Sequence, residues 1–132
     1  MDTIQSRVAT ALLVLRLGVF IVMLMWTLDK FINPGHAALV FERFYHLGGF
    51  GQGILFVIGA VELLIILAFV IGYKKRWSYG AVLLFHTIST LSSYQQYLDP
   101  FQNLLFWAAW PMLAACFALY YLRDLDTKLS VE

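Results

Sequence analysis

Three ionisable side chains lie inside long apolar stretches of the sequence, namely Arg16, Glu62 and His86. A charged group at membrane depth costs several kcal/mol unless it has a partner or water. Each lies roughly 7–10 residues from the expected cytoplasmic end of its membrane span, so the three side chains should share one layer near mid-membrane. Because an unpaired Arg or Glu would be costly there, we expect a buried ion pair between Arg16 and Glu62. This layer is either a structural clasp between helices or a ligand or proton site in which Glu62 and His86 exchange protons. The two roles are compatible.

A second group of polar residues follows His86 at helical spacing. Because polar side chains lack partners in lipid, we expect this stripe to face the bundle interior and to line a pocket that opens outward above the first layer. The alternative is that its hydroxyl groups bond the backbone of their own helix. The candidate pocket residues are Asp29, Lys30, Ser89, Ser93, Gln96, Tyr97 and Asn103.

Several kinds of redox and metal chemistry find little support. A haem in a membrane bundle usually needs two histidine ligands, but only His86 lies in an expected span. Glu42 and His46 share a face in the first connection, a pattern more typical of the wet side of an amphipathic helix than of a metal site. The single cysteine, Cys116, excludes an internal disulfide and a CxxC pair. We therefore expect neither haem nor metal.

The composition is that of a membrane protein. Of the 132 residues, 61% are hydrophobic and 13% are charged, whereas about a quarter of a soluble domain is charged. The formal net charge is +1, with no basic patch, so nucleic-acid binding is not expected. The lipid bilayer is the expected environment.

Four apolar stretches have the roughly 20 residues needed to cross a bilayer. We therefore predict an all-α, integral membrane four-helix bundle that forms a single domain over residues 1–132. Trp107 and Trp110 in the last stretch are either interfacial anchors or the wall of an apolar site. The predicted spans lie near Val8–Leu28, Gln52–Gly72, Tyr79–Leu98 and Asn103–Leu122.

Charge around these spans predicts their orientation. An even number of spans puts both termini on the side of the basic turn Lys74–Arg76. Positively charged flanks stay cytoplasmic, so both termini are expected inside a bacterial inner membrane. The first connection, Asp29–Gly51, then faces outside. Its apolar residues recur at helical spacing after the turn signal Asn33-Pro34-Gly35, which predicts a short amphipathic helix between the first two spans.

The pattern resembles the DoxX family of small four-helix bacterial membrane proteins, which includes the DoxD-like subunit of thiosulfate:quinone oxidoreductase. The resemblance covers roughly residues 13–86. It rests on Arg16-Leu17-Gly18, Trp26 to Phe31, Pro34, Gly59-Ala60-Val61-Glu62-Leu63, Gly72 and Lys74–Arg76. It implies a role beside redox enzymes, and Arg16, Lys30 and Glu62 are the matching polar positions.

Three functional hypotheses remain open. The first is a membrane subunit or accessory protein of a redox system, which binds quinone in the outward pocket through Glu62, His86 or Lys30 and serves a redox-enzyme partner. Without an electron carrier of its own, the chain is not expected to be a complete oxidoreductase. The second is a small solute or proton transporter, or a channel-like protein. The third is a non-catalytic scaffold with a structural ion pair. Homo-oligomerisation is compatible with each.

Overall fold

The computed structural model describes residues 3–49 and 51–132, and this stretch of the chain is all-α. Within these ranges there are six α-helices: α1 (Ile4–Ile32), α2 (Pro34–Tyr45), α3 (Gln52–Ile71), α4 (Lys75–Ser92), α5 (Tyr94–Tyr97) and α6 (Ala109–Tyr121). Short 3₁₀ helices connect or extend them: η1 (Pro100–Gln102), η2 (Leu104–Ala108) and η3 (Arg123–Leu125).

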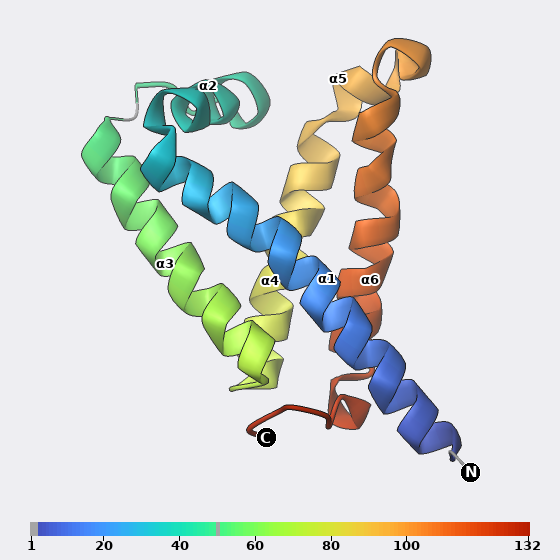
Figure 1. The fold of residues 1–132 in the computed structure, drawn as a ribbon. Coiled ribbons are helices and arrows are strands. Elements are labelled where there is room, and N and C mark those ends of the chain that lie inside the picture. The colour runs from blue at the N-terminus through green and yellow to red at the C-terminus, as the bar shows by residue number, and fades with distance from the viewer. Residues whose placement is uncertain (1–2, 50) are drawn as a thin grey trace.

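The four longest helices surround one hydrophobic core. Helix α1 packs against α3, α3 against α4, α4 against α6, and α6 against α1 (Figure 1). The start of α1, the C-terminal residues and the α3–α4 turn lie at one end of the molecule, low in Figure 1, whereas α2 and α5 lie at the other. We call these the terminal end and the α2 end. The buried core consists of Leu12, Val19, Ile66, Phe69, Tyr79, Val82, Cys116 and Leu119.

Three helical segments of the described residues are long and apolar enough to cross a membrane: Ile4–Ile32, Gln52–Ile71 and Leu104–Tyr121. They indicate a multi-pass membrane protein, and they match the first, second and fourth predicted spans. Helix α1 has 29 residues, or about 43 Å, so it must tilt or project beyond a hydrocarbon core of about 30 Å.

The third predicted span, Tyr79–Leu98, corresponds to two helices rather than to a continuous one. It falls on α4 and α5, which are separated at Ser93. Helix α4 is too polar to count among the candidate spans, and its buried residues include Ser78, His86 and Thr90. These three polar residues of α4 are thus turned toward the other helices, and Thr90 is the one among them that belongs to the predicted polar stripe.

Local sequence signals account for the ends of two helices. Gly72 ends α3 in the left-handed conformation, with φ of +74°, which costs glycine little. Pro34 occupies the first position of α2, where its fixed φ suits a helix start. The predicted amphipathic helix is confirmed: Ala37 is buried, while Glu42 and Arg43 are exposed.

Candidate functional site

An ion pair joins α1 to α3 near the α2 end. Lys30 Nζ lies 3.0 Å from Glu62 Oε2, and Thr27 Oγ1 donates a 3.2 Å hydrogen bond to the same oxygen. Thr27 and Lys30 can both reach Glu62 because residues three apart lie on the same face of a helix. The Lys30 side chain is 9% exposed and that of Glu62 is 21% exposed. We call these three residues the Lys30–Glu62 cluster.

A glycine permits the close approach of α1 and α3 at this cluster. A Cβ placed on Gly59 would lie 2.9 Å from two ring atoms of Phe31 and 3.4 Å from the Cβ of Lys30. Gly59 precedes Glu62 by about one helical turn. The bare backbone at Gly59 therefore lets the Lys30 ammonium and the Glu62 carboxylate meet.

Asp29, the neighbour of Lys30, pairs with a different helix. Its Oδ2 lies 2.6 Å from His36 Nδ1, near the start of α2. The Trp26 ring stacks on the His36 ring with centroids 6.3 Å apart. Asp29 and Trp26 thus hold the first turn of α2 against the end of α1.

Arg16 has partners other than Glu62, so the predicted Arg16–Glu62 pair is wrong. Arg16 Nη1 lies 3.4 Å from Asp126 Oδ2 and donates a 3.3 Å hydrogen bond to the Tyr79 hydroxyl. Tyr79 in turn donates a 2.6 Å hydrogen bond to Asp126. The side chains of Arg16 and Asp126 are 0% exposed. Thr27 lies about 16 Å further along α1 than Arg16, which explains why Arg16 and Glu62 sit at different levels.

The segment that follows η3 supplies the remaining partners of Arg16. We call residues 126–132 the C-terminal strap. Arg16 Nη2 donates to the carbonyls of Lys128 and Leu129, the latter at 3.2 Å. Leu129 has φ of 48°, a left-handed conformation that is uncommon for a residue other than glycine. Sequence reasoning did not single out Asp126, Tyr79 or this segment.

Lys75, at the start of α4, also binds the strap. Its Nζ donates to the carbonyls of Asp126 at 2.6 Å, Glu132 at 3.1 Å and Arg123 at 3.3 Å. Burial lowers the pKa of the Lys75 ammonium, while the Asp126 carboxylate acts in the opposite direction. Lys75 thus fixes η3 and the strap beneath the bundle, on the side from which Asp126 reaches Arg16.

His86 connects α4 to α6 and forms no hydrogen bond or ion pair with Arg16 or Glu62 in the described residues. Its Nε2 lies 3.0 Å from the carbonyl oxygen of Ala109, the first residue of α6. Further along α4, Thr90 Oγ1 donates to the His86 carbonyl at 2.7 Å, and the Tyr97 hydroxyl donates to the Thr90 carbonyl at 2.9 Å. Thr90 therefore bonds the backbone of its own helix, as the alternative interpretation expected, whereas Tyr97 bonds α4 from α5.

The residues predicted to line one outer pocket form two separate groups in the structure, which we call the first and the second place. Asp29 and Lys30 bond α2 and α3, as described above. Asn103 Nδ2 donates to the Asp99 carbonyl at 2.9 Å, and Gln96 Oε1 is buried without a hydrogen-bond partner. Within residues 3–49 and 51–132, no hydrogen bond or ion pair joins the two places. The second place holds Ser89, Ser93, Gln96, Tyr97 and Asn103.

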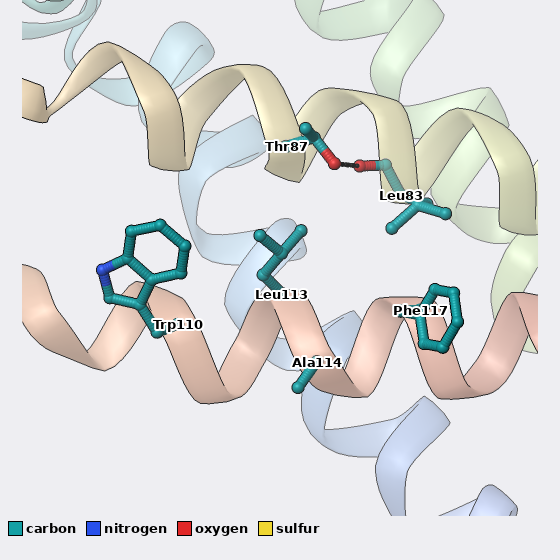
Figure 2. Close-up of a pocket in the computed structure, with 6 residues that line it drawn as sticks. All are labelled: Leu83, Thr87, Trp110, Leu113, Ala114 and Phe117. Carbon is teal, nitrogen blue, oxygen red and sulfur yellow. Dashed lines mark hydrogen bonds between the residues drawn. The ribbon is translucent and has the colours of Figure 1, made fainter.

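A shallow apolar groove of about 500 Å³, open along much of its surface, runs between α4 and α6. Figure 2 shows Leu83 and Thr87 on one side and four α6 side chains on the other. Thr87 donates to the Leu83 carbonyl at 2.7 Å, so its hydroxyl is already paired. The α6 side chains are Trp110, Leu113, Ala114 and Phe117.

Aromatic rings continue beyond the Trp110 end of this groove. The Tyr97 ring lies 5.5 Å from the Trp110 ring and 5.3 Å from the Trp107 ring, both in tilted contact. Tyr97 and Gln96, whose Oε1 atom is buried, belong to the same short segment, α5, and neither residue lines the groove. The groove is therefore apolar along its length, and the Tyr97 and Trp107 rings lie beyond its Trp110 end. Such a surface suits an apolar chain and a planar ring that can pack against Trp110.

Comparison of the chain with protein-family models, curated proteins and solved structures finds no match.

Proposed function

We propose that the chain crosses a bacterial inner membrane four times, with both termini in the cytoplasm. The three apolar segments supply three spans, and α4 with α5 supplies the fourth. Helix α4 can lie at membrane depth because its polar side chains bond the protein rather than lipid. The terminal end carries an excess of basic residues, as expected for a cytoplasmic face. These residues are Arg7, Lys74, Lys75, Arg76, Arg123 and Lys128.

We further propose that the protein is an accessory subunit of a redox system and holds a quinone in the α4–α6 groove. The observation that carries this proposal is the apolar groove with Trp110 and Phe117 in its wall and Tyr97 beside Trp110. An isoprenoid tail would fill the apolar length. The planar ring would stack on Trp110, because offset or tilted contacts favour aromatic pairs. A quinone partner for a redox enzyme is also what the resemblance to the DoxX family implies.

This proposal puts the quinone beside α4 and α6, away from the Lys30–Glu62 cluster. Glu62 already forms an ion pair with Lys30 and accepts a hydrogen bond from Thr27. Neither charged group of the pair is therefore free to hydrogen-bond a quinone carbonyl. His86 lies one residue before Thr87 of the groove, although its Nε2 is next to the Ala109 carbonyl. The chain thus contributes binding and positioning, and electron transfer belongs to a partner.

A structural scaffold is the second candidate. It is favoured by the pairing of both charged clusters within the protein, which matches the expected behaviour of a clasp. Transport of a solute or proton has less support, because Asp29, Lys30, Tyr97 and Asn103 each bond a nearby group.

Filling the groove tests the quinone proposal against the scaffold. We expect Ala114→Phe to lower the amount of quinone that copurifies with the protein by about tenfold or more, because the new ring occupies the space of the tail. The measurement is mass spectrometry of extracted lipids, normalised to protein. Ala60→Phe is the matched control, since Ala60 is exposed on α3 and lies outside the groove. Equal quinone retention by both variants, or no quinone in the wild-type protein, would support the scaffold instead.

A further inference from the structure

A second hollow, of about 450 Å³, lies at the terminal end between the start of α4, η3 and the strap. Three cationic side chains line it, together with a hydroxyl and two carboxylates. Its lining residues are Lys75, Arg76, Arg123, Asp124, Thr127 and Glu132. The Lys75 ammonium is used by backbone carbonyls of η3 and the strap, so Arg76 and Arg123 are the cations left to contact a ligand.

An anionic group already occupies one edge of this hollow. The Glu132 carboxylate accepts a hydrogen bond from the backbone N–H of Lys74, the residue that precedes α4. The first N–H groups of a helix have no intrahelical partner and, with the helix dipole, they favour a negative charge. Lys74 has φ of 49°, so a non-glycine residue adopts a left-handed conformation next to this carboxylate. The carboxylate of Glu132 occupies the place that an oxyanion of a ligand would take.

In the part of the chain that the structure describes, the two arginines contact aromatic rings and form no ion pair with an acidic side chain. The Arg76 guanidinium lies 5.6 Å from the Trp77 ring centre, and the Arg123 guanidinium lies 4.5 Å from that of Tyr120. A cation–π contact leaves the N–H donors at the edge of a guanidinium available. One N–H of Arg123 donates a 2.8 Å hydrogen bond to the Tyr120 carbonyl. The remaining donors suit a phosphate, which binds arginine through paired oxygens.

Exposed aromatic residues surround this end of the bundle and indicate its depth. Trp77 is 71% exposed and Tyr121 is 70% exposed. Tryptophan and tyrosine gather where the hydrocarbon meets the headgroups, and basic pockets on the cytoplasmic side of membrane proteins bind anionic headgroups.

We propose that this hollow binds the phosphate group of an anionic phospholipid through Arg76 and Arg123, at a site where the Glu132 carboxylate competes with it. The inference does not depend on a quinone in the α4–α6 groove, which involves none of these residues. The same phosphate chemistry could come from inorganic phosphate, but the headgroup level of the hollow favours the lipid.

The test measures binding of phosphatidylglycerol by native mass spectrometry, with protein released from phosphatidylcholine nanodiscs that contain a graded amount of phosphatidylglycerol. We expect Arg76→Gln to weaken the apparent affinity about fivefold, the contribution of one basic residue near a membrane surface. Glu132→Gln should strengthen it, because the competing charge is removed. Arg7→Gln is the matched control, since Arg7 is an exposed basic residue at the same end that does not line the hollow.

Two outcomes would overturn the proposal. Equal loss of affinity in Arg76→Gln and Arg7→Gln would mean that only general surface charge attracts the lipid. Unchanged or weaker binding in Glu132→Gln would show that no anion competes with that carboxylate. A parallel arm adds inorganic phosphate to nanodiscs of phosphatidylcholine alone. Arginine-dependent stabilisation by inorganic phosphate, without phosphatidylglycerol binding, would assign the hollow to a soluble ligand and contradict the lipid assignment.

Discussion

Replacing Asp126 with alanine is expected to lower the free energy of unfolding by about 3–5 kcal/mol, the usual cost of leaving one member of a buried ion pair alone. Arg16 and Asp126 are both 0% exposed, so the Arg16 guanidinium would be left buried without its ion-pair partner. Tyr79 would also lose the acceptor of its 2.6 Å hydrogen bond. The measurement is equilibrium unfolding in mixed micelles, followed by far-ultraviolet circular dichroism.

Asp124→Ala is the control for this prediction. Asp124 is exposed, and we expect its loss to change stability by less than about 0.5 kcal/mol, as is usual for surface substitutions. The double variant Arg16→Met/Asp126→Leu should be more stable than Asp126→Ala, because an apolar pair leaves no buried charge. If Asp126→Ala and Asp124→Ala have the same stability, the Arg16–Asp126 pair does not hold the strap in place.

Replacing Glu62 with leucine is expected to cost about 1–3 kcal/mol of stability while quinone retention stays at the wild-type level. The cost is smaller than for Asp126 because Lys30 and Glu62 are 9% and 21% exposed, so water relieves some of the charge left on Lys30. Quinone should be retained because Glu62 lies on α3, which does not line the groove. Unfolding and lipid mass spectrometry are measured on the same preparation.

A double-mutant cycle with Lys30→Met isolates the coupling between the two charges. We expect the double variant to be less destabilised than the sum of the single variants, since each single variant leaves one unpaired charge. If Glu62→Leu loses quinone as completely as Ala114→Phe while unfolding normally, Glu62 is a ligand-binding residue and the assignment of the groove is wrong.

The helices of this fold were largely predictable because their signals are local. The apolar run up to Gly72 predicts α3, and Asn33-Pro34-Gly35 followed by an amphipathic pattern predicts α2. The cost of an unpaired charge in an apolar span predicts a partner for Arg16 and for Glu62, and each forms an ion pair, although not with the other. Their partners could not be predicted from the sequence, because pairing depends on how far along the bundle each residue lies and on the strap, which folds back under the helices.

The correction at Arg16 has a specific physical cause. Asp126 follows the last span by a few residues, and nothing in its sequence neighbourhood distinguishes it from exposed Asp124. Only the return of the strap beneath α4, held by Lys75, brings Asp126 to Arg16. The α4–α6 groove could not be predicted from the sequence either, because it depends on how the side chains of two helices pack against each other. Trp110, expected either as an interfacial anchor or as the wall of an apolar site, does line the groove.

Fluorescence of single-tryptophan variants tests the central claim, that a quinone binds beside Trp110. One variant keeps Trp110 and the other keeps Trp77, with the remaining tryptophans replaced by phenylalanine. Both are titrated in nanodiscs with a short-chain quinone, which quenches indole emission on close contact. We predict saturable quenching for Trp110 and only a linear, unsaturated decrease for Trp77, which lies at the terminal end. A linear decrease of equal slope for both tryptophans would contradict the claim that the groove is a quinone site.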